Sequence, residues 1–238
     1  MSTLLGIFAK YPRPGTVKTR LARRIGAPAA AELYEAMLRD VVDRCATVGN
    51  RRVMAFACGA EDRSTATEYF RAIAPAYTLW EQIGTTLGAR MRMFFDTHLG
   101  GTEGARRVVL IGSDAPWVTP ALIEQAFARL QHRDCVIGPA ADGGYYLIGL
   151  STSCPEAFSD AIPWSGSRVL AATVEALQRN GRRLELLPLG FDVDTTESLD
   201  VLAGLIAAGR TAQRSPSSSE RPGLSRTERW LRAHGFLG

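Results

Sequence analysis

The feature that most constrains the fold is a short apolar run near the N-terminus that leads into a proline-rich loop. Residues 4–9 read LLGIFA, a continuous apolar stretch that is typical of a buried strand. The next segment, 10–21, contains Pro12, Pro14 and Gly15, which disfavour both helix and β-ladder. A shaped loop is therefore expected at the carboxyl end of a first strand, which is where α/β sheets bind their ligands.

Basic side chains gather on this loop, and no acidic residue precedes Glu32. The predicted phosphate-binding set is Lys10, Arg13, Gly15, Lys18 and Arg20. Lysine provides a point charge, arginine a bidentate fork and the loop backbone further N–H donors, so the simplest partner is an oligophosphate. A solvated basic surface is the alternative. Neither a P-loop nor a G-x-G-x-x-G fingerprint is present, because Val17 stands where a P-loop needs its second glycine.

Apolar runs alternate with helical patterns along most of the chain. Strands are expected at 4–9, 52–58, 77–82, 107–111, 135–137, 146–148 and 184–187, and helices at 28–48, 61–74, 87–98, 120–130, 167–179 and 196–208. This alternation predicts an α/β fold, a mostly parallel sheet with helices on both faces. With 238 residues, of which 46% are hydrophobic, one domain with a sizeable core is expected over 1–210.

The C-terminal part of the chain has a different composition. Residues 211–223 are rich in Ser, Pro and Arg and are predicted to form a flexible linker. Residues 224–238, with Trp230, are expected to form a short helical tail. This tail either packs back onto the domain or contacts a partner, which leaves a homodimer open.

Carboxylates follow two predicted strands and precede the last core helix. Asp114 comes directly after the strand 107–111, and Asp142 lies in a glycine-rich loop with Gly143, Gly144 and Tyr145. A ligand lying against this loop would have a tyrosine beside it. An Asx-turn or a helix cap is the alternative for Asp114, and an ordinary Asp-Gly-Gly turn for Asp142.

Two further carboxylates, Asp192 and Asp194, lie just before the last predicted core helix. In an extended backbone these two side chains point to opposite sides, so one is expected to face the pocket. Thr195 or Thr196 is expected to cap the following helix. A basic loop together with two or three carboxylates at strand ends is what a Mg²⁺-nucleotide requires, since Mg²⁺ binds carboxylates and substrate phosphates.

Composition excludes several classes of function. The net charge of +4 is modest and no basic stripe with interleaved aromatics recurs, so no nucleic-acid partner is expected. No long apolar run and no signal-like segment is present, which predicts a cytoplasmic protein without a membrane span. The three histidines are isolated, so no catalytic or metal role is expected for them. Trp117, just after Asp114, is the best aromatic candidate for a stacking surface.

Four motifs in order resemble the bacterial DUF2064 family. They are K-x-P-x-P-G-x-V-K-T-R-L from Lys10, G-S-D-x-P around Asp114, D-G-G-Y-Y-L-I-G from Asp142 and D-x-D-T ending after Asp194. The family is assigned to GT-A-fold glycosyltransferases of the nucleotide-diphospho-sugar transferase superfamily, and some members are linked to arsenosugar biosynthesis. The resemblance covers about residues 3–208.

The resemblance implies a three-layer α/β/α, Rossmann-like GT-A domain that binds an NDP-sugar or NTP with Mg²⁺ or Mn²⁺. Asp114 stands where the superfamily's metal-binding aspartate follows a central strand, and Asp194 is similar to the second metal-site carboxylate of related nucleotidyltransferases. The segment from Glu81 to Met91 resembles a family segment that places Gln82 and Arg90 beside the nucleoside.

Three functions compete at this point. The first is a glycosyltransferase that moves a sugar to a small-molecule acceptor, with metal on Asp114 and Asp194 stabilising the departing phosphate and Asp142 orienting the sugar or acceptor, or acting as base. The second is a nucleotidylyltransferase that couples an NTP to a phosphorylated small molecule and releases pyrophosphate. The third is a non-catalytic nucleotide-binding domain, which would not need all three carboxylates.

Overall fold

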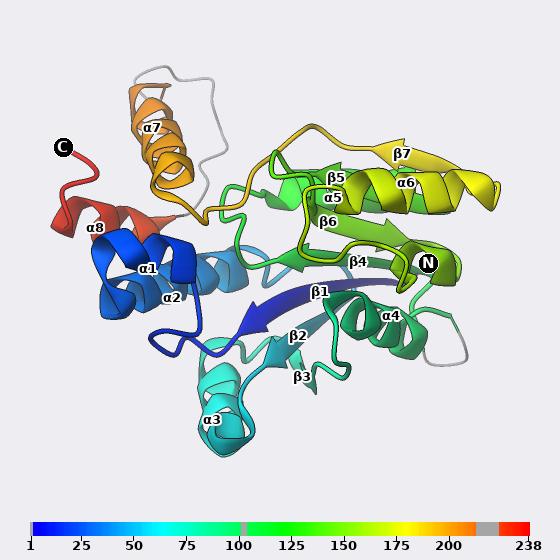
Figure 1. The fold of residues 1–238 in the computed structure, drawn as a ribbon, viewed down its shortest axis with the longest axis horizontal. Helices are drawn as coiled ribbons and strands as arrows, with labels where there is room; N and C mark the ends of the chain where they lie inside the picture. Colours follow the sequence, from blue (N-terminus) through cyan, green and yellow to red (C-terminus); the bar gives the residue numbers. More distant parts are fainter. Residues whose placement is uncertain (1, 101–103, 213–223) are drawn as a thin grey trace.

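The computed structural model describes residues 2–100, 104–212 and 224–238, and its centre is a seven-stranded mixed sheet (Figure 1). The strands are β1 (Thr3–Lys10), β2 (Arg51–Ala57), β3 (Thr78–Glu81), β4 (Arg107–Gly112), β5 (Cys135–Pro139), β6 (Tyr145–Leu150) and β7 (Leu184–Leu186). The helices are α1 (Thr19–Ile25), α2 (Ala27–Arg44), α3 (Arg63–Ile73), α4 (Leu87–His98), α5 (Pro120–Arg129), α6 (Val169–Arg179), α7 (Thr196–Ala212) and α8 (Ser225–Ala233), with 3₁₀ turns η1 (Ala60–Asp62) and η2 (Pro155–Phe158).

The strand order β3-β2-β1-β4-β6-β5-β7 confirms the expected, mostly parallel α/β sheet. β1 pairs in parallel with β2 on one side and β4 on the other. β6 runs antiparallel to both of its neighbours, β4 and β5. The connection between β5 and β6 is too short for a crossover, so the two strands form a hairpin. The hairpin loop with Asp142 therefore lies at the same sheet edge as the carboxyl ends of β1 and β4.

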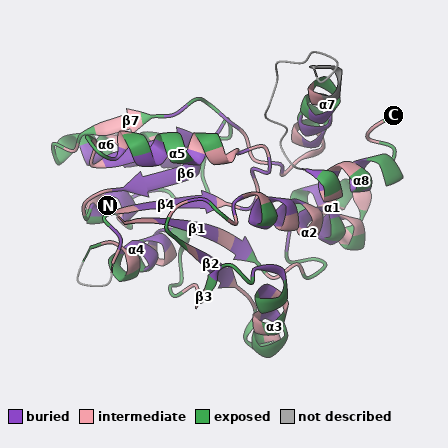
Figure 2. Ribbon diagram, turned by 180° about the vertical axis from the view of Figure 1, so that it is seen from behind, coloured by how far each residue is buried: buried purple, intermediate pink, exposed green. Residues whose placement is uncertain are grey.

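Helices cover both faces of the sheet (Figures 1 and 2), and each face has its own buried cluster. On one face, α2, α3 and α5 pack against the sheet, over alternate β1 residues such as Leu5 and Ile7, and residues of α7 and α8 extend the same buried cluster beyond α2. On the other face, α4, α6 and η2 pack over Leu4. Gly6 permits this second layer, because a Cβ there would lie 2.3 Å from the Phe94 ring of α4. Period-two alternation along the strands thus produces a three-layer α/β/α fold.

Helix bounds differ from the expectation in several places, most clearly at α1, α2 and α7. Residues 10–21 were expected to form a loop, but residues 19–25 form the helix α1. No helix-breaking residue stands between Gly15 and Gly26, and the buried side chain of Leu21 holds this short helix in place. α2 ends at Arg44 rather than at residue 48. α7 extends to Ala212, and residues 213–223 lie outside the described part, so the flexible linker stays a prediction.

The C-terminal helix α8 packs against α2. The buried carboxylate of Asp40 accepts hydrogen bonds from the backbone N–H and the hydroxyl of Thr227, both at 2.8 Å. Asp40 thus caps the first turn of a helix that lies 187 residues further along the chain. In the described part of the chain, no helix has the length and apolar character needed to cross a membrane.

Candidate functional site

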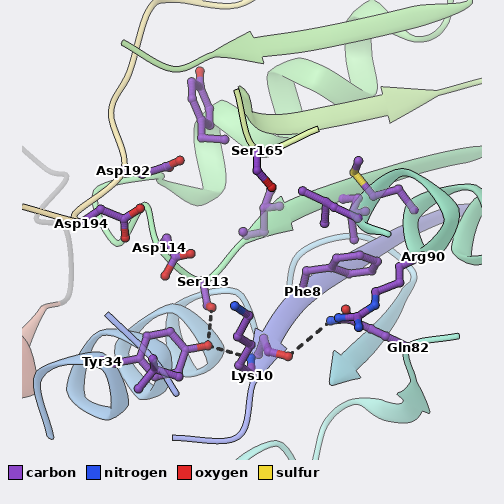
Figure 3. A pocket seen from close by; sticks show the side chains of 18 of the residues that line it. Phe8, Lys10, Tyr34, Gln82, Arg90, Ser113, Asp114, Ser165, Asp192 and Asp194 are labelled. Atoms are coloured by element: carbon purple, nitrogen blue, oxygen red, sulfur yellow. Dashed lines mark hydrogen bonds between the residues drawn. The ribbon is translucent and has the colours of Figure 1, made fainter. Parts of the chain in front are cut away.

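The carboxyl ends of β1 and β4 open into a cavity of about 710 Å³ (Figure 3). A volume of this size is within the ordinary range for small-molecule sites. Asp114, Asp192 and Asp194 lie on one side of the cavity, the charged end, and Phe8, Gln82 and Arg90 lie on the other (Figure 3). Leu87, Met91 and Leu110 add apolar surface to the lining. Of the predicted site residues, those that line the cavity are Lys10, Lys18, Arg20, Gln82, Arg90, Asp114, Tyr145 and Asp194.

Lys18 is the electrostatic centre of the charged end. Its ammonium nitrogen lies 2.5 Å from Oδ1 of Asp114 and 2.8 Å from Oδ1 of Asp194, and its side chain is only 2% exposed. Burial opposes the charge on Lys18, but the two carboxylates outweigh burial and raise its pKa. The lysine therefore stays charged and holds together two carboxylates that are 80 residues apart in the chain.

Asp194 is positioned by the start of α7. Its backbone N–H and that of Thr195 both donate to Oγ of Ser198 at 3.0 Å, and Oγ1 of Thr195 accepts from the Ser198 N–H at 3.3 Å. This reciprocal cap shows that the capping role belongs to Thr195. Burial alone would raise the pKa of Asp194. The charge and the hydrogen bond of the adjacent Lys18 together outweigh burial, so the pKa is lowered.

Asp192 and Asp194 both line the cavity, which corrects the expectation that one of them turns away. The backbone between them is not extended, because the Asp194 N–H donates to the Asp192 carbonyl at 3.1 Å in a tight turn. Burial, and then the charges of Asp114, Asp142 and Asp194, raise the pKa of Asp192 to about 7. The charged end therefore contains three carboxylates rather than two.

Tyr34, to which sequence reasoning assigned no role, ties the two strand ends together. Its buried hydroxyl accepts a hydrogen bond from the Lys10 N–H at 2.8 Å and shares a second with Ser113 Oγ at 2.9 Å (Figure 3). Lys10 ends β1, and Ser113 follows β4. A tyrosine within an apolar helical stripe gives no signal of this contact, which depends on how α2 crosses the sheet.

The basic residues of the first loop separate into two groups. Lys10 and Arg20 line the cavity, and no ion pair is recorded for either within the described ranges. Arg13 instead pairs with Glu61 and Asp62, each at 2.8 Å, and does not line the cavity. Gly15, at φ 82°, shapes the turn without lining it.

Gln82 and Arg90 both lie at the opposite end of the cavity from the three aspartates (Figure 3). The Gln82 side-chain nitrogen donates to the carbonyls of Ala9 at 3.3 Å and Ala55 at 2.8 Å. Because both partners can only accept, the amide orientation is fixed and its oxygen is left as an acceptor. Nε of Arg90 donates to the Gly84 carbonyl at 2.9 Å, which positions the guanidinium at the cavity.

The Asp-Gly-Gly loop is only partly in the cavity. Asp142 is exposed, its Oδ1 accepts from the Gly144 N–H at 2.9 Å, and neither residue lines the cavity. A Cβ on Gly143 would lie 1.9 Å from the Ser167 carbonyl oxygen, so this glycine allows close contact with the loop before α6. That loop brings Ser165, which sequence reasoning missed, to the cavity at φ 72° (Figure 3).

Two aromatic candidates have structural partners. Trp117 packs against Tyr146 and Phe191, and its indole N–H donates to the Phe191 carbonyl at 2.7 Å. It does not line the cavity, so it provides no stacking surface there. The Tyr145 ring does line the cavity, and burial raises the pKa of its hydroxyl.

The residues at the charged end fit a divalent cation that arrives with phosphates. Oδ1 of Asp114 and Oδ1 of Asp194 contact the same ammonium nitrogen, so both lie within reach of one cation, and their side chains are 43% and 39% exposed towards the cavity. Within residues 2–100, 104–212 and 224–238, no group of three or more His, Cys, Asp or Glu is arranged to hold a metal alone. Mg²⁺ needs only one or two carboxylates when phosphate oxygens complete its shell.

Three solved structures have folds similar to that of this chain. A protein of Desulfovibrio desulfuricans G20, provisionally named a nucleotide-diphospho-sugar transferase, is 36% identical over 99% of this chain and 96% of its own, with a TM-score of 0.82. A 4-diphosphocytidyl-2C-methyl-D-erythritol synthase from Anaerococcus prevotii DSM 20548 is 10% identical over 82% of this chain and 92% of its own, with a TM-score of 0.52.

A CMP:2-keto-3-deoxy-manno-octonic acid synthetase complexed with CTP is 12% identical over 87% of this chain and 99% of its own, with a TM-score of 0.52. At such low identities, it and the erythritol synthase show the fold alone. No functionally curated protein matches the chain. Together with the sheet order, these similarities confirm the expected GT-A-like, nucleotide-diphospho-sugar transferase fold.

One family model matches the chain, that of an uncharacterized protein conserved in bacteria (DUF2064), over residues 41–166. This range contains Gln82, Arg90, Asp114 and the Asp142 loop, whereas the basic first loop and Asp194 lie outside it. The 36% identical Desulfovibrio structure extends the similarity over both missing parts. The chain belongs to the DUF2064 family.

Proposed function

We propose that this protein is a metal-dependent transferase that acts on a nucleotide-diphospho-sugar and moves the sugar to a small-molecule acceptor. The observation that carries the proposal is the cavity at the ends of β1 and β4. It combines basic side chains, Lys10 and Arg20, with carboxylates, Asp114 and Asp194, that fit one divalent cation. Open α/β sheets bind ligands at this edge.

The two ends of the cavity suit the two ends of such a donor. Gln82 offers an acceptor oxygen and Arg90 offers donors, and Phe8 and Met91 provide apolar surface, which together fit a nucleoside. Lys10 and Arg20 fit the diphosphate, because ammonium and guanidinium groups both bind phosphate oxygens strongly. The sugar then lies towards Asp192 and Ser165.

The chain's own side chains would act mainly by positioning and charge. A divalent ion held by Asp114 and Asp194, Mg²⁺ or Mn²⁺, would stabilise charge on the departing phosphate. Lys10 and Arg20 would neutralise the remaining phosphate charge without needing to reorganise. Three carboxylates line the cavity, and of these Asp192 has no recorded ion pair in the described part of the chain. We therefore assign Asp192 to orient or deprotonate the acceptor hydroxyl. Asp142 is exposed and does not line the cavity, but its charge acts on Asp192, and it is assigned to orient the sugar or acceptor from outside.

Product analysis tests the reaction type. A thermal-shift panel of NTPs and NDP-sugars, with and without Mn²⁺, first identifies the nucleotide, since a ligand at about 100 times its Kd stabilises the native state by about 2.7 kcal/mol. ³¹P NMR then follows that nucleotide with candidate acceptors, among them phosphorylated ones. Release of a nucleoside diphosphate supports glycosyl transfer. Release of pyrophosphate from an NTP contradicts it and assigns nucleotidylyl transfer, and no metal-dependent shift with any nucleotide refutes both.

A further inference from the structure

Lys18 stands in an unusual backbone conformation at a functional position. Among the described residues, the two non-glycine residues with left-handed φ are Lys18, at 50°, and Ser165, at 72°, and both line the cavity. A left-handed lysine costs free energy and persists only where surrounding contacts demand it. At Lys18 those contacts are the two carboxylates of Asp114 and Asp194, at 2.5 and 2.8 Å from its ammonium nitrogen.

This geometry places a fixed positive charge where a divalent cation would approach. The Lys18 side chain is 2% exposed, so its ammonium has little contact with solvent and its charge is balanced mainly by the two carboxylates. When a free Mn²⁺ or Mg²⁺ approaches Asp114 and Asp194, the Lys18 ammonium already neutralises part of their negative charge. The positive charge of the ammonium also repels the ion at contact distance. At contact distance and beside a buried ammonium, such repulsion is large compared with thermal energy.

We infer that Lys18 is a built-in counter-ion that keeps free divalent ions off the Asp114–Asp194 pair and makes metal binding depend on the nucleotide's phosphates. This inference rests on the proposed function. A diphosphate brings negative charge beside the ammonium, so the site as a whole can then accept a dication. The metal and the nucleotide therefore bind with positive coupling, and each raises the affinity for the other by the same factor. Lys18 is a positioning residue here.

The test measures binding of Mn²⁺ alone, without nucleotide, by electron paramagnetic resonance of the free ion. Lys18→Met keeps the aliphatic stem and removes the charge, and we expect it to bind Mn²⁺ at least about tenfold more tightly than the wild-type protein. Lys10→Met is the matched control, because it removes the same charge from the wall of the same cavity, and no carboxylate contact is recorded for Lys10 in the described ranges. Its effect on Mn²⁺ affinity should be several-fold smaller.

A gain of affinity cannot come from general damage to the fold. The double variant Lys18→Met with Asp114→Asn should lose that gain, which shows that the carboxylates hold the ion. Should Lys18→Met fail to fold, Lys18→Gln replaces it. Unchanged or weaker Mn²⁺ binding in the Lys18 variant, or an equal gain in Lys10→Met, overturns the inference. Neither of these results bears on whether a nucleotide binds, so the proposed function is tested separately.

Discussion

Tyr34→Phe should loosen the connection between the two strand ends that frame the cavity. The substitution removes one buried hydroxyl that accepts from the Lys10 N–H at 2.8 Å and pairs with Ser113 at 2.9 Å. The Lys10 N–H is partly buried, and a backbone N–H left without a partner costs about 1–3 kcal/mol when it is buried from water. A lost hydrogen bond with a hydroxyl that can turn elsewhere costs about 0.5–1.5 kcal/mol. We therefore expect the free energy of unfolding to fall by about 2–3 kcal/mol.

Urea denaturation measures this change by linear extrapolation, and Tyr77→Phe is the matched control. Tyr77 is also buried, but its hydroxyl donates a single hydrogen bond, to the Val42 carbonyl at 2.8 Å, far from the cavity. The control should lose about 1 kcal/mol. Tyr34→Phe should also weaken nucleotide binding, whereas Tyr77→Phe should not. A loss in Tyr34→Phe no larger than that of the control would refute the reasoning.

Three further predictions test the supports of the fold. Asp40→Ala removes the acceptor of the Thr227 N–H and hydroxyl, and should lower the free energy of unfolding in urea by about 2–4 kcal/mol. The control Asp43→Ala, at an exposed neighbouring position, should lower it only slightly. Gly143→Ala would place a Cβ 1.9 Å from the Ser167 carbonyl, so it should lower Tm clearly more than Gly181→Ala, where φ is also positive, at 67°, but the space is open. The Arg183 side chain lowers the pKa of Asp134, so this pair stabilises the fold above the carboxyl's ordinary pKa and loses that contribution as the pH falls through the folded-state value. Asp134→Asn should flatten the acid limb of a stability–pH curve between about pH 2 and 5, and an unchanged limb would contradict this assignment.

The sheet and most helices were predictable because they depend on local periodicity. The strands around Leu5 and Val109 are continuous apolar runs, and Thr119 with Pro120 marks a helix start unambiguously. The loop prediction was wrong for the start of α1, because the basic, proline-containing segment gives no sequence signal that its end is helical. Short helices take their stability from packing, here of Leu21, which a sequence pattern does not reveal.

The site was predictable in its chemistry and less so in its connections. Asp114 was predicted from its position directly after a strand, since strand-end positions follow from topology. Asp194 was predicted from the resemblance to a metal-site carboxylate of related nucleotidyltransferases, and both residues line the cavity. Three features of the site depend on detailed geometry that involves distant segments. They are the turn that brings Asp192 to the same side as Asp194, the contact of Arg13 with Glu61, and the ion pairs of Lys18 with both carboxylates. No spacing rule contains that information. Tyr34 and Ser165 were missed for the same reason.

Calorimetric titration tests the central claim most directly, that a metal–nucleotide complex binds between the basic loop and the Asp114–Asp194 pair. The nucleotide identified by thermal shift would be titrated with Mn²⁺ into the wild-type protein, Asp114→Asn and the exposed control Asp200→Asn. The account predicts that Asp114→Asn loses most of the metal-dependent affinity while it still unfolds in one cooperative thermal transition, at a lower Tm than the control because the buried Lys18 loses one of its two carboxylates. Equal affinities for all three proteins would contradict the account.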